Sequence, residues 1–449
     1  MKCLSLNQPC TIETSEKVAL PKFNRSESIS CAADCVKMVC NEKYGRHYIA
    51  TRDIKAGEVV FCEESHYIHL RLTQIYLVCS HCLAFAWAGI PCDSCVFSMY
   101  CSNKCKNEAW SLYHDIQCPI LSHLNCEELQ KFNLIVIANF VRIFIIIIRR
   151  EGLKQIIEEA EEIDNHDGIG IEKLLFNNRL DCQKFRSIYN LMKTKKIFPR
   201  DDQDDYIAMV LSLSETFLKN QCETNQYEID DETLYTSMTT ILKKLDDINV
   251  FNTFVYQSSI CTCTDFYSCD VNCPSKIGSI LAPCSSLINH SCDQHLSRMC
   301  LPGPKIVLFT LRPVTKGEQI CTSYGPDPKV PRKDRRETLQ NNLEFVCDCK
   351  ACHENWPTPP PLPSMERLMR LWSGAPKELN QACALILDTP MEKWSYSEKL
   401  MGDAANMLDF IYKHLDDREA FTVAEVFRAY IDRAFFGLYG ENIDLPNTC

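Results

Sequence analysis

Between residues 120 and 250, apolar residues recur at intervals of three and four with polar residues between them. This spacing predicts helices with one buried face. The most apolar run, 134–148, is interrupted by Asn139 and Arg142, and it is too short and too polar to span a bilayer, so a buried helix is expected there. Beyond 365 the pattern predicts four more helices. The clearest predicted helices are 152–163, 180–194, 204–220, 232–245, 399–414 and 419–436.

Two other stretches are rich in β-forming residues and contain a similar phrase. In the first, residues 47–50 and 58–62 are predicted strands, and 53–57 has the composition of a turn that closes a hairpin between them. In the second, 312–320, a Gly-Glu pair again stands just before a strand. The repeat predicts two β lobes of one domain, separated by a long insertion. Further strands are expected at 250–256, 277–281, 305–311 and 319–324.

Composition narrows the class of protein. A chain of 449 residues with 46% hydrophobic residues can form two or three domains with their own cores. The net charge of -11 argues against a primary role on naked nucleic acid and suits a basic partner, such as a Lys-rich peptide. The 29 cysteines accompany no secretory signal pattern near the start, so we expect a reduced protein of the nucleus and cytoplasm that uses thiolates to bind metal.

The strongest motif lies at 79–118, where seven cysteines and one histidine fall in forty residues. Two cysteine pairs have the x2 spacing of zinc knuckles, and two pairs of ligands stand four residues apart, on one face of a helix. Eight ligands make two closed tetrahedra, so both zinc ions should be structural rather than catalytic. The ligands are Cys79, Cys82, Cys92, Cys95, Cys101, Cys105, His114 and Cys118.

A second cysteine cluster stands at the end of the β-rich region. The sequence Cys347-x-Cys349-x2-Cys352 is one thiolate short of a tetrahedral zinc site, and Cys292 is the candidate for the missing ligand. Two interpretations stay open for four cysteines between 261 and 273, a further zinc site or free thiols in a loop. Three cysteines between 31 and 40 are expected to be ordinary thiols. These two sets are Cys261, Cys263, Cys269 and Cys273, and Cys31, Cys35 and Cys40.

The order of these motifs resembles the SET and MYND domain (SMYD) family of protein lysine methyltransferases. The resemblance rests on the hairpin phrase, the finger, the helical insertion, Asn-His-Ser-Cys at 289–292, Ser-Tyr at 323–324 and the cysteine tail. In the way it diverges from the family, this chain is more similar to arthropod members than to vertebrate members. It implies an α+β fold, a SET β-fold split by a MYND zinc finger and a helical insertion, with a zinc-binding post-SET tail and a C-terminal helical domain. The implied boundaries are 1–40 (N-terminal extension), 41–78 (first SET lobe), 79–118 (finger), 119–249 (insertion), 250–346 (second SET lobe), 347–356 (tail) and 357–449 (linker and helical domain).

In this family, S-adenosylmethionine binds between the SET lobes and the target lysine enters by a narrow channel from the opposite face. The resemblance therefore places the first hairpin against the methionine part of the cofactor, Asn289 and His290 at its amino and adenine ends, and Phe345 near the adenine. Tyr324 matches the catalytic tyrosine at the mouth of the lysine channel. The implied cofactor-binding residues are Gly45, Arg46, Asn252, Ser286, Asn289, His290, Tyr324 and Phe345.

The family also implies how the metal ligands are shared among three zinc ions. Its finger pairs its ligands in an interleaved way, and its tail closes one further site. The implied groups are Cys79, Cys82, Cys101 and Cys105; Cys92, Cys95, His114 and Cys118; and Cys292, Cys347, Cys349 and Cys352.

The sequence departs from the family pattern in three places, which involve four residues. Gln294 and His295 replace Pro-Asn after the tetrapeptide and Asp293, and His47 replaces a glycine that lets the cofactor approach the first hairpin. Leu343 replaces a second channel tyrosine. The cofactor-binding set is thus mostly intact, whereas the channel has lost a hydroxyl group.

The resemblance implies methyl transfer from S-adenosylmethionine to lysine on histone or non-histone proteins. The alternative is an adaptor with little or no turnover that regulates transcription through contacts of the zinc finger, because related fingers bind short proline-containing peptides. The expected partners are a lysine-containing protein substrate and such peptides. We expect a monomer that binds neither membranes nor, directly, nucleic acid.

Overall fold

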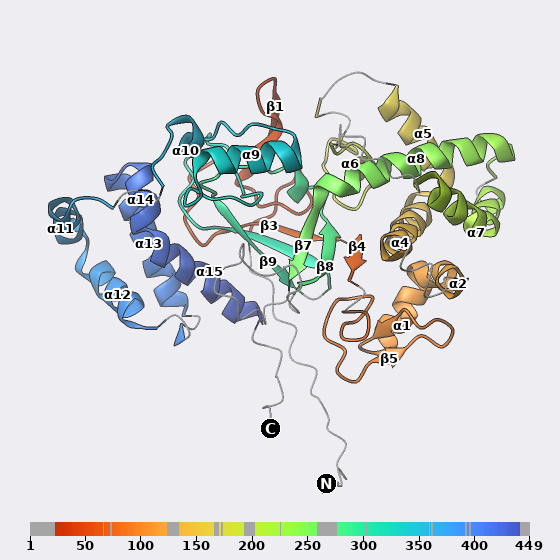
Figure 1. Cartoon of the computed structure of the whole chain (residues 1–449), viewed down its shortest axis with the longest axis horizontal. Helices are drawn as coiled ribbons and strands as arrows, with labels where there is room; N and C mark the ends of the chain where they lie inside the picture. The colour runs from red at the N-terminus through yellow and green to blue at the C-terminus, as the bar shows by residue number, and fades with distance from the viewer. Residues whose placement is uncertain are drawn as a thin grey trace, which may run out of the picture.

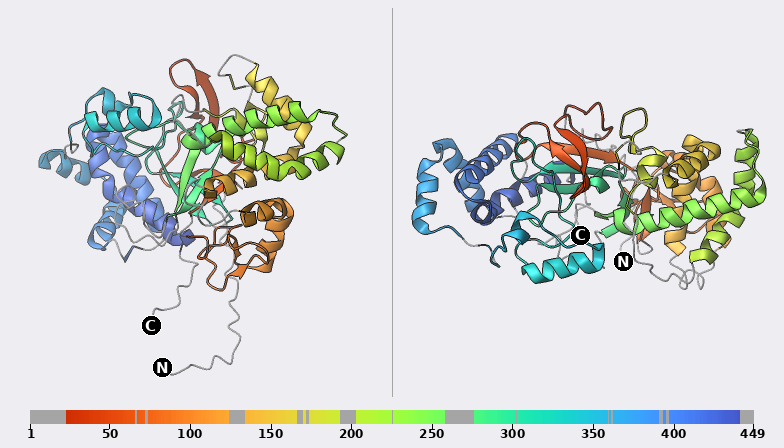
Figure 2. Two further views of the ribbon diagram at one scale, coloured as in Figure 1. Left: turned by 45° about the vertical axis from the view of Figure 1, so that its right-hand side comes forward. Right: turned by 90° about the horizontal axis from the view of Figure 1, so that it is seen from above.

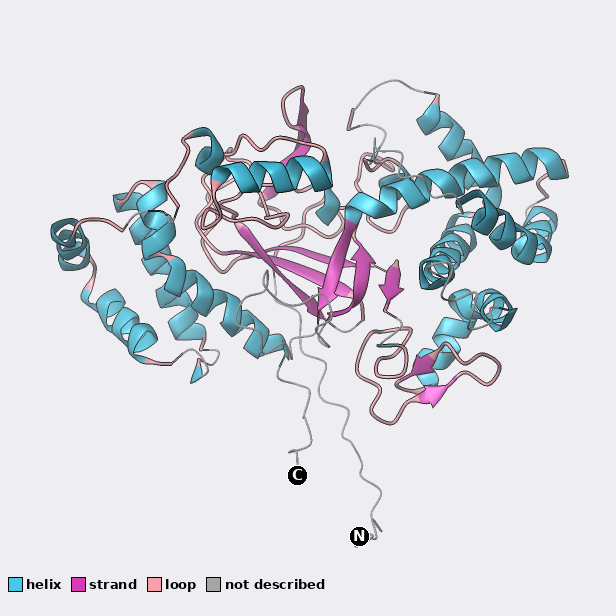
Figure 3. Ribbon diagram, in the orientation of Figure 1, coloured by secondary structure: helices cyan, strands magenta, loops and turns pink. Residues whose placement is uncertain are grey.

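The computed structural model describes residues 23–440 apart from 66, 72–73, 124–133, 166–169, 172–173, 193–202, 225, 258–275, 302, 359, 361, 391–392 and 395–396. Most strands lie in the middle of the molecule, the helices of the insertion lie on one side, and the C-terminal helices lie on the other (Figures 1 and 3). The view from above keeps this order (Figure 2). The chain thus combines separate helical and β regions, as an α+β class predicts.

The strands form small antiparallel sheets rather than one large sheet. Their orders are β1-β2, β3-β10-β9, β4-β8-β7 and β5-β6. Their bounds are β1 Val36–Asn41, β2 Gly45–Ala50, β3 Val59–Glu64, β4 Ile68–Leu70, β5 Ile90–Pro91, β6 Met99–Tyr100, β7 Thr253–Gln257, β8 Lys276–Leu281, β9 Leu296–Leu301 and β10 Lys305–Thr310.

The helices fall into three groups, one in the finger, one in the insertion and one after residue 331. A π-helical turn at Trp110–His114 joins α1 to α2, and a short 3-10 turn, η4, occupies Ser285–Leu287. The helices are α1 Asn103–Ala109, α2 Asp115–His123, α4 Leu134–Glu151, α5 Leu153–Asp164, α6 Phe185–Tyr189, α7 Gln203–Thr224, α8 Asp231–Asn252, α9 Arg332–Leu343, α10 Lys350–His353, α11 Met365–Gly374, α12 Lys377–Asp388, α13 Glu398–His414, α14 Asp417–Val423 and α15 Glu425–Gly440.

The pairing predicted for the first hairpin is wrong. β2 pairs with β1, which the sequence analysis did not predict, and β3 pairs with β10. The turn at 53–57 instead pairs with the second copy of the phrase, because the N–H groups of Ile54 and Val314 each donate to the other residue's carbonyl at 2.9 Å. Two similar phrases therefore meet face to face, which supports the prediction of two lobes in one domain.

The two phrases also form the same local turn. The carboxylate of Glu58 accepts from the Lys55 N–H at 2.7 Å, and that of Glu318 accepts from the Thr315 N–H at 2.9 Å. In each copy the carboxylate satisfies an N–H three residues earlier. The Gly-Glu repeat noticed in the sequence thus corresponds to a repeated turn.

The second lobe begins with a strand that is shorter than predicted. Helix α8 continues to Asn252, and β7 starts only at Thr253, so the strand expected at 250–256 is partly helical. In the middle strand of this sheet, a Cβ on Gly278 would lie 1.9 Å from the His69 carbonyl oxygen. Only glycine allows β4 and β8 to approach this closely.

Other sequence predictions also need correction. The helix expected at 180–194 is limited to α6 among the described residues, and 319–324 makes isolated bridges rather than a continuous strand. The predicted helix 419–436 is two helices, α14 and α15, with Ala424 between them. Strand β9 was not predicted. In most of these cases the sequence pattern of a short segment was ambiguous, and tertiary contacts determined its secondary structure.

The apolar run of the insertion is a buried helix, as predicted. The described side chains from Val141 to Ile148 of α4 are all buried. Among the described residues, no helix has both the length and the apolar character that are needed to cross a membrane.

The C-terminal helices cover one face of the β3-β10-β9 sheet. Phe309 of β10 stacks on Phe435 of α15 with ring centroids 4.0 Å apart, and Leu408 and Ile411 of α13 belong to the same buried cluster. Side-chain caps begin several of these helices; for example, Ser397 accepts from the Leu400 N–H at 3.3 Å. The helical tail therefore shares a hydrophobic core with the sheet.

Candidate functional site

The finger brings its eight predicted ligands into two groups of four. Cys79, Cys82, Cys101 and Cys105 form one group, and Cys92, Cys95, His114 and Cys118 form the other, with all ligand atoms of each group within 4.8 Å of one another. Sulfur–sulfur distances include 3.6 Å for Cys82–Cys101 and 3.7 Å for Cys92–Cys118. Four ligands at about 2.3 Å from one zinc ion would lie about 3.8 Å apart, so the spacing fits zinc.

The histidine ligand is held in the tautomer that metal binding requires. Its Nδ1 lies 3.0 Å from the Gln117 Oε1, so Nδ1–H donates to the amide oxygen. Nε2 is then the unprotonated nitrogen, and it lies 3.3 Å from the Cys92 sulfur. A second partner that fixes the ring in this way is typical of zinc-bound histidine.

Helix α4 holds the finger against the rest of the protein. The buried Arg142 donates to the carbonyl oxygen of Ser80 at 2.5 Å and lies over the Tyr113 ring at 4.1 Å. Arg149 makes a bidentate ion pair with Asp115 at 2.8 and 2.6 Å. The charge that interrupts the apolar run is thus the group that anchors the loop between the first two ligands.

The tail forms a third group from Cys292, Cys347, Cys349 and Cys352, as predicted. The Cys292 sulfur lies 3.6 Å from that of Cys352 and 4.0 Å from that of Cys347, which again fits a zinc tetrahedron. The sequence analysis missed the role of Arg335. This fully buried residue of α9 donates to the Cys352 sulfur at 3.5 Å, and such a donor stabilises a metal-bound thiolate.

His290 connects the tail group to the end of the second lobe. Its Nδ1 accepts from the backbone N–H of Tyr324 at 3.0 Å, so Nε2 carries the hydrogen and lies 3.4 Å from the Cys292 sulfur. Burial lowers the pKa of His290 to about 4, which keeps the ring neutral at physiological pH. Both ring nitrogens are therefore used inside the protein, and only the ring face and the backbone are left for a ligand.

Three aromatic rings from separate segments meet at this point. The ring centroid of His290 lies 5.4 Å from that of Tyr324 and 6.0 Å from that of Phe345, and Tyr324 and Phe345 are 6.2 Å apart. Tyr324 is 40% exposed, and its hydroxyl donates to the Ile288 carbonyl at 2.7 Å. The three predicted residues thus form one aromatic cluster that is partly open to solvent.

The first hairpin reaches the same place. The Asn289 Nδ2 donates to the Tyr44 carbonyl at 3.0 Å, directly before Gly45. Gly45 has a φ of +61°, and a Cβ there would meet nothing within 4 Å, so there is open space beside the backbone. His47 is buried and donates through Nδ1 to the Gly45 carbonyl at 2.9 Å. The histidine that departs from the family pattern is therefore accommodated, but it occupies a carbonyl of the turn.

The other predicted cofactor residues have roles within the protein. The Asn252 amide donates to the carbonyls of Met192 and Ile248 at 2.8 and 2.6 Å, and the Ser286 hydroxyl donates to the Asn252 carbonyl at 3.0 Å. Arg46 donates to the Asn190 carbonyl at 2.7 Å. These side chains connect the second lobe and the hairpin to the insertion.

The departure after the tetrapeptide is also built into the fold. Asp293 pairs with Arg312 at 3.4 Å and with Arg428 at 3.3 Å. The His295 Nε2–H donates to Glu318 at 2.8 Å, while its Nδ1 accepts from the Cys321 N–H at 3.1 Å. The buried histidine is therefore a neutral ring that joins the segment after the tetrapeptide to residues 318–321.

Gln294 and Leu343, the remaining departures from the family pattern, also contact other parts of the protein. Gln294 accepts from the Ser323 N–H at 3.0 Å through its Oε1, next to Tyr324. Leu343, at the position of the second channel tyrosine, packs on the apolar cluster around the tail cysteines. The first replacement supports the tyrosine's backbone, whereas the second adds apolar packing and no hydroxyl.

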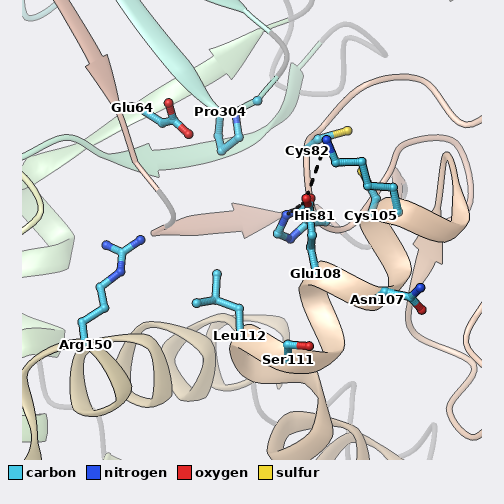
Figure 4. Close-up of a pocket in the computed structure, with 12 residues that line it drawn as sticks. Glu64, His81, Cys82, Cys105, Asn107, Glu108, Ser111, Leu112, Arg150 and Pro304 are labelled. Carbon is cyan, nitrogen blue, oxygen red and sulfur yellow. Dashed lines mark ion pairs between the residues drawn. The ribbon is translucent and has the colours of Figure 1, made fainter.

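A cavity of about 830 Å³ lies beside the finger (Figure 4). Its lining includes His81, Cys105 and Glu108 of the finger, Glu64 at the end of β3 and Arg150 of α4, and an ion pair joins His81 to Glu108 at 3.5 Å. None of the residues predicted to bind the cofactor lines it. The cavity belongs to the surface between the finger and the SET lobes.

The sequence analysis missed one further group of possible ligands. Cys31, Glu63, Cys182 and Cys284 meet in the interior. They come from four distant segments, and no local spacing marks them. The cysteines between 261 and 273, for which a further zinc site and free thiols both stayed open, lie outside the described residues.

Comparisons with known proteins identify the family to which the chain is similar. A SET domain family model matches residues 45–325, which is more than half of the chain. The protein-lysine N-methyltransferase SMYD4 of Pongo abelii is 23% identical over 403 residues, covering 76% of this chain and 48% of that protein. A SET and MYND domain-containing protein of Dictyostelium discoideum is 22% identical over 328 residues, covering 71% of this chain and 81% of that protein.

Two further matches are more limited. The histone-lysine N-methyltransferase SMYD3 of Homo sapiens is 22% identical over 317 residues, covering 71% of this chain and 61% of that protein. A solved SET domain of LSMT bound to lysine and AdoHcy aligns with 94% of this chain and 87% of that chain, at a TM-score of 0.28 and 11% identity, too distant to compare the folds. The chain spans about half the length of the SMYD4 relatives. From the family match, these relatives and its own order of motifs, the chain belongs to the SET domain family and, within it, to the SET and MYND domain proteins.

Proposed function

We propose that this chain is an S-adenosylmethionine-dependent protein-lysine N-methyltransferase that acts on histone or non-histone proteins in the nucleus and cytoplasm. One observation carries the proposal. The aromatic cluster of His290, Tyr324 and Phe345 lies beside Asn289, which in turn binds the hairpin turn at Tyr44. Residues distant in sequence thus meet at one point, which supports a shared ligand site there.

The open space at Gly45 and the partly exposed aromatic faces fit a ligand with an adenine ring and an amino acid part. When bound, S-adenosylmethionine would supply a sulfonium methyl group for transfer to an amine. The aromatic faces could stack on the adenine, and the backbone beside Gly45 could approach the methionine part closely because no side chain intervenes. A neutral His290 places no additional positive charge beside a cationic cofactor.

The chemistry requires a neutral lysine. A free lysine with a pKa near 10.4 is neutral only about once in ~2500 molecules at pH 7, so the site must favour the amine by desolvation and by orienting its lone pair. The Tyr324 O–H donates to the Ile288 carbonyl, which leaves the phenol oxygen to accept a hydrogen bond from the substrate amine. Tyr324 would thus orient the amine without acting as a strong base.

The test measures cofactor binding and turnover separately. We expect calorimetry to detect S-adenosylmethionine binding and radiolabelled methyl transfer to appear on an array of lysine-containing peptides. Tyr324→Phe should lower kcat by about 100-fold, because the amine loses its acceptor while the ring that faces the cofactor is kept. The control is Tyr235→Phe, at an exposed tyrosine of α8, which should keep full activity.

The outcomes distinguish the possible functions. Absence of cofactor binding would overturn the methyltransferase proposal. Cofactor binding with unchanged turnover in Tyr324→Phe would remove the tyrosine from the mechanism. Cofactor binding without any methyl transfer would favour the second candidate.

The second candidate is an adaptor that regulates transcription through the finger. It is supported by Leu343, which packs into the tail where the family has a channel hydroxyl, and by the cavity beside the finger. Short proline-containing peptides are the proposed partners of the finger. A pull-down with such peptides, compared between the intact protein and a Glu108→Ala variant, would test whether this surface binds them.

A further inference from the structure

Four side chains that no local motif connects meet in the interior of the SET core. The sulfur atoms of Cys31, Cys182 and Cys284 and a carboxylate oxygen of Glu63 all lie within 4.8 Å of one another. All four residues are buried, with exposed fractions of 2%, 7%, 0% and 0% for the three cysteines in order and Glu63. The three groups predicted as zinc sites meet the same distance limit.

Backbone hydrogen bonds fix two of these ligands relative to each other. The Ser30 N–H donates to the Leu180 carbonyl at 2.9 Å, and the Leu180 N–H donates to the Ser28 carbonyl at 2.8 Å. This short parallel bridge sets the segment before Cys31 beside the segment before Cys182. Their proximity therefore follows from the fold rather than from one side-chain conformation.

The other two ligands are fixed in a similar way. The Cys62 N–H donates to the Cys31 carbonyl at 2.8 Å, which brings β3 and its next residue, Glu63, to the group. The N–H groups of Cys284 and Ser285 donate to the two carboxylate oxygens of Glu63 at 2.9 and 2.7 Å. Hydrogen bonds from backbone N–H groups thus hold four separate segments of the chain close together around one point.

Polar groups around Cys182 and Glu63 suit anionic ligands at these two positions. The Cys182 sulfur accepts from the Ser30 hydroxyl at 3.4 Å and from the Gln183 amide at 3.7 Å, as a thiolate would. The Glu63 carboxylate also accepts from the Ser285 hydroxyl at 2.7 Å, so three of its roughly four lone-pair sites are used and one is left. Burial raises the pKa of Glu63, and no basic side chain of the described residues forms an ion pair with it, so a bound cation would supply the charge that keeps this carboxylate ionised.

We propose that Cys31, Cys182, Cys284 and Glu63 bind a structural zinc ion. Three thiolates and one carboxylate form a closed tetrahedral set of the ligand types that zinc prefers. Ligands around zinc lie about 3.8 Å apart, so a limit of 4.8 Å requires the group to contract by no more than about 1 Å. Binding releases to solvent whatever protons the four ligands carry and involves no change of oxidation state.

The position of this ion gives it a structural role. Cys31 precedes the first lobe, Glu63 lies in β3, Cys182 lies in the insertion, and Cys284 leads into η4 and the tetrapeptide at 289–292. One zinc ion would therefore link both SET lobes and the insertion to each other, next to the segment that carries Asn289 and His290. This differs from the finger sites, whose ligands all fall within 79–118, and from the tail site, which joins two segments of the chain.

The test counts zinc in the full chain by mass spectrometry of the metal content. We expect four zinc ions per chain for the unmodified protein and three for Cys182→Ala. Two matched controls should keep four: Cys35→Ala, a buried thiol outside every cluster, and Cys263→Ala, which probes the cysteines at 261–273. Three ions in the unmodified protein, even after zinc is added, would overturn the proposal. A loss of one ion in Cys263→Ala but not in Cys182→Ala would also overturn it.

A second measurement decides the case in which Cys182→Ala does not fold. Anomalous scattering at the zinc edge, from crystals of the unmodified chain, should give a peak among Cys31, Glu63, Cys182 and Cys284. Absence of that peak, or a disulfide between two of the three cysteines in peptide mapping, would overturn the proposal. Neither measurement depends on methyltransferase activity.

Discussion

The finger and the candidate cofactor site are organised in opposite ways. All eight finger ligands fall within 79–118, and the spacing of their pairs already indicates which side chains can share an ion. The cofactor site combines a hairpin at 45, a tetrapeptide at 289–292, a tyrosine at 324 and a phenylalanine at 345. The difference teaches that a site can be predicted from the sequence when its ligands are close together along the chain. When strand pairing brings distant residues together, the site is recognised only in the folded structure.

The largest effect is expected when the finger loses one ligand. Cys105→Ser should lower the zinc content by at least one ion per chain, because the serine hydroxyl is a poor zinc ligand. Since structural zinc supplies about 10–16 kcal/mol of apparent folding free energy in zinc-finger peptides, the finger should unfold locally. Hydrogen exchange should then become fast across 79–118 and stay slow at 286–290.

Unfolding of the finger should not extend to the rest of the protein. Cys222→Ser, at a thiol of α7 outside the metal groups, should change neither the zinc content nor the exchange. Equal loss of protection in the finger and in the tetrapeptide would contradict the view that the finger is a locally closed unit. Arg142 and Arg149 would then be the route by which the damage spreads.

An intermediate effect is expected when the two parts of the cofactor site are separated. Asn289→Ala removes the hydrogen bond to the Tyr44 carbonyl and so releases the hairpin turn beside Gly45. Losing one hydrogen bond and its positioning should weaken S-adenosylmethionine binding by about 10-fold, which is about 1.4 kcal/mol. Calorimetry measures this change, and the zinc content should stay the same.

Asn107→Ala is the matched control, at an exposed asparagine of α1 beside the cavity. It should leave cofactor affinity unchanged. If Asn289→Ala binds S-adenosylmethionine as tightly as the unmodified protein, the tie between hairpin and tetrapeptide does not shape the site.

The smallest effect concerns pH and His295. Burial, assisted by the charge of Arg312, lowers the pKa of His295 below its unfolded value near 6.5, although Glu318 opposes the shift. The unfolded chain therefore binds the proton more readily, so this contribution to stability is complete above about pH 6.5 and is lost as pH falls toward the folded pKa. His295→Asn should reduce the loss of stability between pH 7 and pH 5 by about 1 kcal/mol.

Thermal midpoints at the two pH values measure this effect. His414→Asn, at an exposed histidine of α13, is the control and should show the same pH dependence as the unmodified protein. A pH dependence that is unchanged in His295→Asn would show that the neutral ring between Glu318 and Cys321 does not control acid stability.

Much of the fold could be predicted from the sequence where one face of an element is buried over many residues. The helices at 152–163, 204–220 and 232–245 are present as α5, α7 and α8, and the apolar run at 134–148 is the buried α4. Short elements were predicted less well. The strand at 36–41 was missed, and 180–194 contains only a five-residue helix among its described residues, because short segments take the structure that their neighbours impose.

The sequence by itself identified the metal ligands of the finger and tail from their spacing, whereas their division into groups was implied by the resemblance to the family and agrees with the structure. It also identified the repeated Gly-Glu phrase, but assigned its first copy to the wrong partner. Only the tertiary structure decided that the copies pair at Ile54 and Val314, that both nitrogens of His290 are used internally, and that Cys31, Glu63, Cys182 and Cys284 meet. The physical reason is that these contacts join residues 30 to 260 positions apart, whose approach depends on strand pairing and core packing rather than on local spacing.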